Sequence, residues 1–495
     1  MAILPEVKSH YGKLKFYIDN QWVESASSEV QETTNPATGR PIAEYPTATR
    51  DEARAAVESA QRGFKAWNEI ALRERAKTLF DMRQAFEEDY DVLCRVLTQD
   101  HGRTMGESRG SVRRVIENIE SACAACYAMP KLNEHIDQLA TGIDEYLIYE
   151  PLGIFLIVTP GNIPMHAWSS FVPYALAAGC SVVVSPSRQD PVAAEYITRT
   201  IEKLNLPPGL INLVHGGRQI NDFILRQPEV QGVGFIGSTA AGQALFKTCG
   251  ELGKSSSLNG NGKNCVVIMP DADLDIAAQY LLRACFGMTG QRCLGSDNVL
   301  VHEKVFDQMK EKFVAAAKAM KIGYGLDESM ELGPHASRNG MEKTLAWIDK
   351  CLSEGGKLAL DGRETVPAEC KDGYFVGATI FEDVTTEMEV TTEESFGPLA
   401  CLMRFNDLDK VIEWHNKANY DQGHSACIMT ADNKAARKFI REMETGNIGV
   451  NVAVPQPYSF FPLASKKQSF LGNAKSRYAS MRLFLDEKTV TSRWV

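Results

Sequence analysis

The stretch between Glu150 and Arg188 contains no Asp, Glu, Lys or Arg. A hydropathy scan would mark it as a membrane segment, but prolines at 160, 164 and 173 leave no clean run of about 20 apolar residues. Its outer parts, 153–158 and 182–184, are apolar on both faces, which is typical of central parallel strands that are covered on two sides. The stretch therefore predicts a buried strand, a loop, a helix and a second strand.

The same alternation continues along the chain. Short apolar runs at 211–214 and 233–236 alternate with helical patterns at 191–204 and 219–227, which predicts a doubly wound α/β unit. A helix-rich region, 50–129, precedes this unit, and a hairpin is expected near 17–22. A second α/β unit follows, with expected strands at 265–269, 298–301, 379–381, 400–404 and 426–429, and helices at 274–285, 305–320 and 433–443.

Composition narrows the classes of function. The 495 residues are 44% hydrophobic and 23% charged, which is ordinary for a globular protein and excludes dominant disorder. The net charge of −10 argues against a nucleic-acid surface, which needs a clustered basic excess. The twelve Cys are scattered, and the only C-x-x-C, Cys123 with Cys126, lies in a helical stretch and is interpreted as packing thiols rather than a redox or zinc site. We therefore expect no metal site, and a reducing, cytoplasmic location without an export signal in residues 1–15.

Four local patterns carry possible chemistry. Cys293 ends a Gly290-Gln-Arg-Cys293 turn, where an exposed thiol could attack a carbonyl or could simply be buried. Asn162 follows a buried strand and could donate to an oxyanion or form an ordinary turn. Gly237 and Ser238 begin a helix expected at 240–249, where an anion could bind, although a plain strand–helix turn has the same appearance. Glu394 lies in an acidic loop that is either solvated or the edge of a pocket.

Together the fragments resemble the aldehyde dehydrogenase superfamily over nearly the whole chain. The segments that carry the resemblance are Asn35-Pro-Ala-Thr-Gly39, Thr159-Pro-Gly-Asn-Ile-Pro164, Ser185-Pro-Ser187, Gly237-Ser-Thr-Ala-Ala-Gly242, Gly290-Gln-Arg-Cys293 and Glu393-Glu-Ser-Phe-Gly-Pro398. The resemblance implies that Cys293 is the nucleophile and Asn162 the oxyanion donor. It also implies cofactor-binding roles for Ser185, Gly237, Ser238, Glu394 and Phe396.

Within the superfamily, the chain is most similar to the CoA-acylating methylmalonate-semialdehyde dehydrogenases. The similarity rests on Arg292 before the nucleophile, on Gly446-Asn-Ile-Gly-Val-Asn451 and on the run from Lys488 to Trp494. Hydrolytic members have a water-activating Glu where this chain has Asn259, and Asn cannot act as a base at neutral pH. The resemblance therefore implies that coenzyme A, rather than water, releases the acyl group. A hydrolytic enzyme that recruits Glu393 or another base, and a non-catalytic structural member, remain alternatives.

Two departures bear on the ligands. Arg188 stands where the family has a Glu that holds the adenosine ribose, and a guanidinium could instead grip a 2′-phosphate, so the cofactor is NAD or NADP. The alternative is that Arg188 points to solvent. His166 could touch coenzyme A or the acyl group, or be a structural residue, and Asn261 replaces a family Gly, so the local backbone is expected to differ.

Two arginines indicate the substrate. Arg292 precedes the nucleophile, where it would also favour the thiolate, and Arg114 matches the position of a substrate-carboxylate Arg in the resembled branch. Two converging guanidinium groups would select a short acidic semialdehyde, such as malonate or methylmalonate semialdehyde. Propanal or a sulfonated aldehyde, and a surface position for Arg114, are the alternatives.

The resemblance also implies an architecture. We expect an α/β fold with a Rossmann-type cofactor-binding domain at 1–126 and 142–258, an α/β catalytic domain at 259–455, and a small β oligomerisation element from 127–141 and 456–495. The expected partners are a small aldehyde and coenzyme A, with no nucleic acid and no membrane. Pairing of strands across subunits would give a homodimer or homotetramer.

Overall fold

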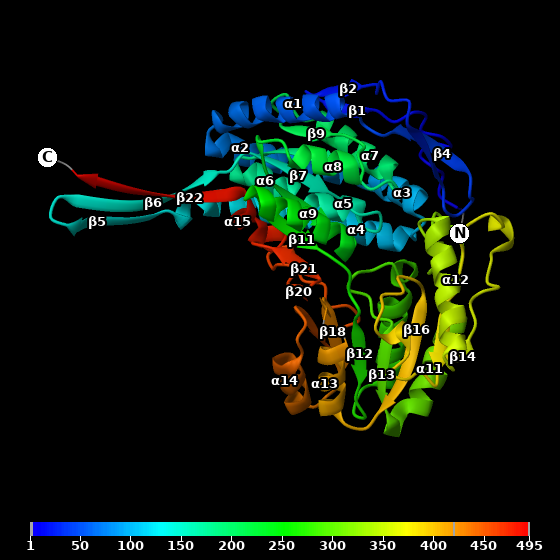
Figure 1. Cartoon of the computed structure of the whole chain (residues 1–495). Coiled ribbons are helices and arrows are strands. Elements are labelled where there is room, and N and C mark those ends of the chain that lie inside the picture. Colours follow the sequence, from blue (N-terminus) through cyan, green and yellow to red (C-terminus); the bar gives the residue numbers. More distant parts are fainter. Residues whose placement is uncertain (1–2, 419–420, 494–495) are drawn as a thin grey trace.

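The computed structural model describes residues 3–418 and 421–493, so the outermost residues of the predicted first and last segments lie outside it. The described chain forms two bodies, each built on its own sheet, and a thin arm that projects from the first body (Figure 1). The predicted mixed α/β fold, with a cofactor-type sheet and a second α/β unit, is confirmed.

The first body contains an eight-stranded sheet in the order β2-β1-β9-β8-β7-β10-β11-β21. The five strands from β9 to β11 in this order are mutually parallel. The bounds are β1 (Phe16–Ile18), β2 (Gln21–Val23), β7 (Ile154–Val158), β8 (Ser181–Ser185), β9 (Ile211–Leu213), β10 (Val230–Ile236), β11 (Ser255–Asn259) and β21 (Phe470–Gly472). The expected hairpin near 17–22 is β1 with β2.

The charge-free stretch provides β7 and β8 at the centre of this sheet, as predicted. Alternate residues of β7 enter different cores: Phe155 and Ile157 pack on one face, and Leu156 packs on the other. A strand that is covered on both faces has no position for a charge, which explains the composition of the stretch. The one expected helix between these strands is two, α5 (Pro164–Ser169) and α6 (Val172–Ala178), because Pro173 suits only the first turn of a new helix.

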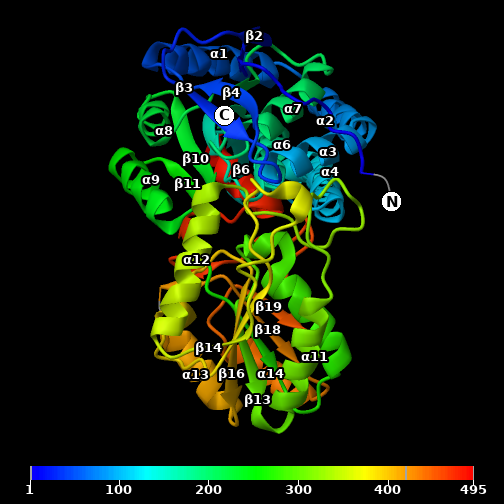
Figure 2. The ribbon, with the colours of Figure 1, turned by 90° about the vertical axis from the view of Figure 1, so that its right-hand side faces the viewer.

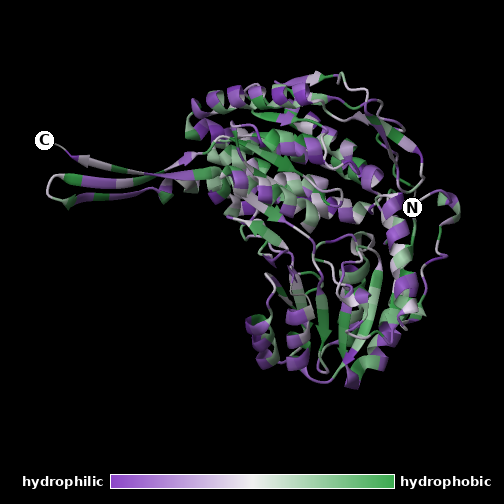
Figure 3. Cartoon of the chain, viewed as in Figure 1, coloured by the Kyte–Doolittle hydropathy of each residue, from purple (hydrophilic) through white to green (hydrophobic). Residues whose placement is uncertain are grey.

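Helices cover both faces of the eight-stranded sheet. One layer, with α1, α8 and α9, packs beside β7, β10 and β11, and the other, with α2, α3, α4 and α7, packs around α5 and α6. Figure 3 shows the hydrophobic strands inside and hydrophilic turns outside. The helices are α1 (Arg50–Asn68), α2 (Leu72–Glu88), α3 (Tyr90–His101), α4 (Met105–Ala128), α7 (Pro191–Glu202), α8 (Arg218–Leu225) and α9 (Thr239–Leu252).

The second body contains a seven-stranded sheet in the order β14-β15-β16-β13-β12-β18-β19, in which only β14 is antiparallel to its neighbour. Its strands are β12 (Cys265–Ile268), β13 (Asn298–His302), β14 (Lys357–Leu360), β15 (Thr379–Glu382), β16 (Leu399–Phe405), β18 (Ser425–Met429) and β19 (Asn447–Val450). Its helices are α10 (Leu274–Leu281), α11 (Phe306–Lys318), α12 (Arg338–Ser353), α13 (Leu408–Ala418) and α14 (Asn433–Glu442). The expected strands and helices of this unit are present; α12, α13, β14 and β19 were not foreseen.

The arm is a three-stranded antiparallel sheet of β5 (Glu134–Ala140), β6 (Ile143–Pro151) and β22 (Leu485–Arg493). Each residue of β6 pairs with one of β22, from Pro151 with Leu485 to Ile143 with Arg493. All seven residues of β5 are exposed. The sequence-based division counted β6 with the cofactor-binding segment, whereas the strand lies in the arm, and β21 of the last segment instead joins the eight-stranded sheet.

Shorter elements connect these parts. Two small pairs of strands are β3 (Val30–Thr34) with β4 (Pro41–Pro46), and β17 (Gln422–Gly423) with β20 (Lys466–Lys467). The short helical turns are η1 (Met129–Leu132), η2 (Leu282–Phe286), η3 (Gly287–Gly290), η4 (Glu303–Val305), η5 (Ala368–Cys370), η6 (Glu389–Thr391), η7 (Arg477–Ser480) and α15 (Met481–Phe484).

The functional edge lies where the two bodies meet (Figure 2). Parallel strands β7, β10 and β11 all end there, so the segments that follow them, beginning at Thr159, Gly237 and Gly260, come together. The second body contributes the loop with Cys293, which follows η3 and precedes β13. Two adjoining cavities are each lined by residues of both bodies, including Asn162 and Cys293.

Candidate active site

Cys293 lies on a constrained loop. The chain passes from α10 through a π-helical turn, η2, into η3, where Met288 and Thr289 have left-handed φ values of 54° and 57°. Gly290 also has a left-handed φ, and a Cβ there would lie 1.8 Å from the carbonyl oxygen of Gly397, so only glycine fits this approach. All twelve cysteines are free, and Cys293 is the one that is not buried. The predicted nucleophile is therefore the accessible thiol of the described chain.

Asn162 lies across from this loop, as the resemblance implied. Its Nδ2 donates to the carbonyl oxygen of Gln291 at 2.9 Å, and its own carbonyl oxygen accepts from the Arg103 guanidinium. An amide nitrogen carries two N–H groups, so one remains for an oxyanion formed near Cys293. Arg103 belongs to no recognised motif; it is fully buried and fixes the backbone of Asn162.

Three connected hollows form the site, and the thiol lies in the walls of two of them. The inner cavity, of about 340 Å³, is lined among others by Arg114, Asn162, His166, Arg292, Cys293 and Arg477. The middle cavity, of about 430 Å³, includes Cys293, Glu394 and Phe396. The outer cleft, of about 760 Å³, includes Arg188, Gly237 and Ser238 and shares the last two with the middle cavity. The thiol can therefore be approached from two sides.

The environment of Cys293 opposes ionisation overall. Although Cys293 is partly accessible, the protein atoms packed around its sulfur exclude most water, and this desolvation raises the pKa of its thiol to about 11. The Glu394 carboxyl adds to the rise, whereas Arg292 and Arg477 lower the pKa. The expectation that Arg292 favours the thiolate is correct in direction, but burial outweighs it. At neutral pH the resting thiol is therefore protonated, and it ionises when a reaction removes its proton.

Asn259 ends β11 in a buried position, and among the described residues neither its side-chain nitrogen nor its side-chain oxygen has a hydrogen-bond partner. Two residues later, Asn261 binds the start of α9: its Oδ1 accepts from the Thr239 N–H at 2.6 Å, and its own N–H donates to Thr239 Oγ1 at 3.0 Å. Its Nδ2 donates to the Glu394 carboxylate. The Asn in place of a Gly thus adds a polar bridge between the two bodies.

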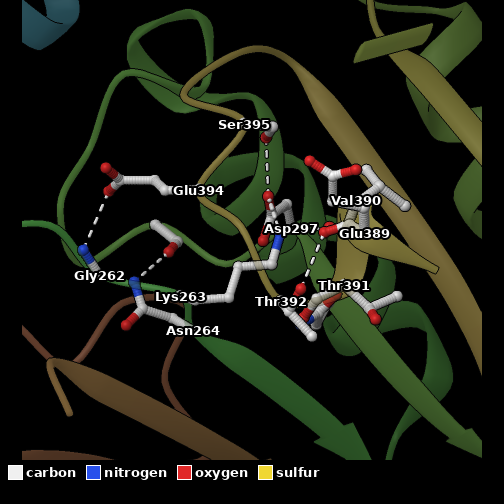
Figure 4. A network of polar contacts seen from close by, with 12 residues as sticks. Gly262, Lys263, Asn264, Asp297, Glu389, Val390, Thr391, Thr392, Glu394 and Ser395 are labelled. Atoms are coloured by element: carbon white, nitrogen blue, oxygen red, sulfur yellow. Dashed lines mark hydrogen bonds and ion pairs between the residues drawn. The ribbon is translucent and has the colours of Figure 1, made fainter. Parts of the chain in front are cut away.

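Glu394 is held at the middle cavity by the same segment, because its Oε1 accepts from the Gly262 N–H at 3.1 Å (Figure 4). Burial raises the pKa of its carboxyl to about 7. Glu393, the residue considered as a replacement base, is exposed and does not line the inner or middle cavity. Glu393 therefore does not lie where it could act on the Cys293 adduct. The carboxylates that share a cavity with Cys293 are Glu394 in the middle cavity and Glu107 in the inner cavity.

A buried ion pair stiffens the loop that carries Glu394. Lys263 Nζ lies 2.6 Å from Asp297 Oδ2 and donates to the carbonyl oxygen of Val390 at 2.6 Å. Ser395 Oγ donates to the same carboxylate oxygen of Asp297 at 2.7 Å (Figure 4). The segment that follows β11 and the loop that contains Glu394 are therefore joined through one lysine that is wholly buried.

The outer cleft has the groups that a dinucleotide needs. Ser238 is the N-cap of α9 and accepts from the Ala241 N–H at 3.4 Å, so the positive end of this helix faces the cleft beside Gly237. Arg50, Arg188 and Arg218 line the cleft, against a single acidic residue, Glu29. These residues fit a diphosphate and a further anionic group. When NAD or NADP binds there, it supplies the hydride acceptor.

The predicted cofactor residues do not all line the hollows. Arg188 faces the cleft, and a Cβ on Gly217 would lie 2.5 Å from its Nη2. Ser185 ends β8 with a buried hydroxyl that has no hydrogen-bond partner in the part of the chain that the structure describes, and it does not line the cleft. Ser187, two residues later, does. Phe396, with a φ of 51°, and Glu394 lie together at the middle cavity, as the resemblance implied.

Both predicted substrate arginines, Arg114 and Arg292, line the inner cavity. Arg114 lies 2.9 Å from Glu117 Oε2, and its guanidinium lies 4.8 Å from the centre of the Tyr458 ring. His166, in α5, is buried in the cavity wall, and its Nε2 is 3.4 Å from Arg477 Nη2. Sequence reasoning missed Arg477, because it stands alone in a polar segment far from every recognised motif.

The similarity of this chain to known proteins agrees with this geometry. A sequence model described as the Aldehyde dehydrogenase family matches residues 22–490. The chain belongs to the aldehyde dehydrogenase family. It is 36% identical over 482 residues to malonate-semialdehyde dehydrogenase 2 of Geobacillus kaustophilus, covering 97% of this chain and 99% of that protein. The family membership and the semialdehyde dehydrogenase branch expected from the motifs are confirmed.

Solved structures of this family superpose closely. The crystal structure of a methylmalonate-semialdehyde dehydrogenase from Oceanimonas doudoroffii has a TM-score of 0.94 at 30% identity and covers 98% of this chain and 99% of its own. A candidate methylmalonate-semialdehyde dehydrogenase from Sinorhizobium meliloti, complexed with NAD, has a TM-score of 0.95 at 30% identity and covers 98% of both chains.

Within residues 3–418 and 421–493, no group of three or more His, Cys, Asp or Glu is arranged to hold a metal ion. The helices of the same residues are all too short or too polar to cross a membrane.

Proposed function

We propose that this member of the aldehyde dehydrogenase family oxidises a short acidic semialdehyde to an acyl-CoA, with NAD or NADP as the oxidant. The observation that carries the proposal is Asn259, a neutral amide at the end of β11, where hydrolytic members have the carboxylate that activates water. The semialdehyde dehydrogenase names of the relatives and the NAD complex of one structural neighbour support the same reading.

The chain's own groups can perform the chemistry on the carbon atom of the aldehyde. The Cys293 thiol loses its proton to water as its sulfur adds to the carbonyl carbon, and the oxyanion of the resulting thiohemiacetal accepts the second N–H of Asn162 Nδ2. Oxidation of this adduct leaves a thioester on Cys293. Since Asn259 cannot deprotonate water, the thioester persists until the thiol of coenzyme A attacks it and releases Cys293.

The inner cavity supports an acidic substrate. The guanidinium groups of Arg114 and Arg292 line it beside Cys293, and its volume of about 340 Å³ suits a small molecule. A guanidinium binds a carboxylate through two parallel hydrogen bonds, which an uncharged aldehyde cannot form. A carboxylate tail directed at these arginines would leave the carbonyl at the thiol.

One observation favours hydrolysis as a second candidate. Glu394 shares the middle cavity with Cys293, and the pKa of its carboxyl, raised by burial to about 7, suits a general base. Against this role, both of its oxygens already accept hydrogen bonds, from Asn261 and Gly262. The remaining alternative, a non-catalytic structural member of the family, is disfavoured because Cys293 and Asn162 line the same open cavity.

Omission of coenzyme A separates these functions. We expect a burst of about one reduced cofactor per active subunit from 3-oxopropanoate, followed by a slow phase, and steady turnover with an acyl-CoA product once coenzyme A is added. The measurements are cofactor absorbance and mass spectrometry. Asn259→Glu should shift product toward the free acid by supplying a base, and Asn433→Glu, at the exposed start of α14, is the control that adds a carboxylate away from the site. Full-rate release of carboxylate by the unmodified enzyme without coenzyme A would establish the hydrolytic function.

Arg188→Glu should raise the KM for NADP far more than that for NAD. Arg188 lines the outer cleft, and a hydrogen bond to a charged group typically contributes about 1.5–3 kcal/mol. This corresponds to about a 10- to 150-fold increase for NADP. Steady-state kinetics with both cofactors measure the ratio, and Arg226→Glu, at an exposed ion pair on α8's far end, is the control. Equal effects on the two cofactors would mean that Arg188 does not touch a 2′-phosphate.

We further propose that the arm joins subunits into a homodimer or homotetramer and that the enzyme works in the cytoplasm. The exposed edge of β5 offers unpaired backbone groups to another strand, which supports the first point. The twelve free cysteines support a reducing compartment. Light scattering of the purified protein, with and without residues 134–140, tests the role of the arm.

A further inference from the structure

Arg477 is a buried guanidinium in an unusual backbone position. It lies between β21 and α15, is 1% exposed, and has a left-handed φ of 64°, which non-glycine residues rarely adopt. Its N–H donates to the carbonyl oxygen of Ser170 at 3.0 Å, and its Nη1 donates to that of Pro457 at 2.6 Å. The surroundings therefore hold both its backbone and one edge of its guanidinium.

The other edge of this guanidinium faces the inner cavity. Its Nε is buried without a hydrogen-bond partner, and its Nη2 is 3.4 Å from Nε2 of His166. Burial lowers the pKa of His166 well below its usual value, and Arg477 lowers it further, so the imidazole is neutral and can accept from Nη2. His166 thus acts as a positioning residue that directs the guanidinium rather than as a cation.

The charge of the cavity is unbalanced. Four arginines line it against one carboxylate, and that carboxylate, Glu107, accepts hydrogen bonds from the backbone N–H groups of Thr104 and Met288. Arg114 has an acidic neighbour in Glu117, whereas no ion pair of Arg477 is found within residues 3–418 and 421–493. An isolated buried charge is costly, which points to an anionic ligand as the missing partner.

We propose that Arg477 is a specificity-determining residue that binds the acid group of the aldehyde, together with Arg114 and Arg292. The inference rests on the proposed function and extends it: the substrate class is a short aldehyde that ends in an oxyanion, bound by three guanidinium groups rather than two. The cavity volume of about 340 Å³ accommodates such a molecule beside Cys293.

The test compares an acidic and an uncharged aldehyde of equal length. In Arg477→Gln, kcat/KM for 3-oxopropanoate should fall by about 10- to 100-fold, as expected for a lost charged hydrogen bond. The fall for propanal should be much smaller, so the ratio of the two constants is the measured quantity. Arg477→Lys keeps the positive charge but loses the planar pair of N–H donors, so it should restore the ratio only part of the way to that of the unmodified enzyme. Arg482→Gln, at an exposed position on α15, is the matched control. The third substrate, 2-oxoethanesulfonate, shows whether a carboxylate or a sulfonate is preferred.

A binding measurement gives a readout that does not depend on turnover. Malonate should protect Cys293 of the unmodified enzyme from alkylation by iodoacetamide, and should protect Arg477→Gln at least about 10-fold less well. An equal loss for both aldehydes, or unchanged protection by malonate, would overturn the proposal and leave Arg477 a structural residue. If Arg477→Gln is insoluble, the same comparison in Arg477→Lys decides, and an unchanged ratio there overturns the proposal. If every aldehyde is instead turned over at the same rate with and without coenzyme A, the proposed function is refuted. The role of Arg477 is tested separately, because the ratio of the two kcat/KM values does not depend on whether coenzyme A or water accepts the acyl group.

Discussion

Cys293→Ala should abolish aldehyde oxidation with either cofactor, whether or not coenzyme A is present. Removal of a covalent nucleophile from an assembled active site typically costs about 10⁴- to 10⁶-fold in kcat. The loss should be confined to chemistry, because Cys293 lies at the border of the middle cavity, whereas the outer cleft is lined by other residues. Absorbance of the reduced cofactor measures turnover, and fluorescence titration should show cofactor affinity within a few-fold of the original.

The control for this change is Cys123→Ala, because Cys123 is a buried thiol of α4 that lines none of the three hollows. It should retain turnover. Any substantial aldehyde oxidation by Cys293→Ala would mean that another group forms the adduct, and the assignment of the nucleophile would fail.

Lys263→Met should produce the largest loss of stability among these variants. The lysine is wholly buried, and Asp297 is 14% exposed. Removal of the lysine would leave the Ser395 hydroxyl as the remaining side-chain partner of Asp297 among the described residues. Breaking a buried ion pair from one side typically costs about 3–5 kcal/mol of the free energy of unfolding. Urea denaturation followed by fluorescence measures the change, with subunit concentration held constant.

Lys357→Met is the matched control, because its ion pair with Asp383 is largely exposed, and we expect no measurable change. Lys263→Met should also weaken cofactor binding, since the same lysine joins the segment after β11 to the loop that contains Glu394. If the free energy of unfolding is unchanged in Lys263→Met, the ion pair stabilises the fold no more than a buried methionine does at the same position.

Some of the fold could be predicted because a single physical constraint governed the residues. The charge-free stretch had to be covered on both faces, and β7 and β8 are the two central strands. The helix expected after Gly237 and Ser238 is α9, and Ser238 caps it, because a hydroxyl after a strand satisfies a free N–H at a helix start. The segments α12, α13, β14 and β19 were missed, because short or mixed patterns do not distinguish helix, strand and loop.

Some residues of the candidate site could likewise be predicted from the sequence, and others could not. Cys293, Asn162, Glu394 and Phe396 belong to motifs whose spacing is constrained by backbone geometry, and the structure brings all four to adjoining cavities. Ser187 lines the outer cleft and Ser185 does not, so the cofactor role of Ser185 stays a prediction, because a motif does not say which of two serines turns outward. Arg477 was missed for a different reason: its role depends on a tertiary contact with α5, and no local pattern encodes such a contact.

The inner cavity has a consequence for how the enzyme is made. Its wall combines residues of α4, the loop with Cys293 and the segment before α15. The cavity is therefore closed by contacts between parts of the chain that are synthesised far apart in time. A nascent chain that has reached the thiol still lacks Gln456, Leu463 and Arg477, and its cavity is open to water. Folding must wait for these distant contacts, which lengthens the search for the native state and exposes apolar strands meanwhile. The thiol becomes a selective reagent only after assembly, so an incomplete chain carries an exposed cysteine without the pocket that decides what it reacts with.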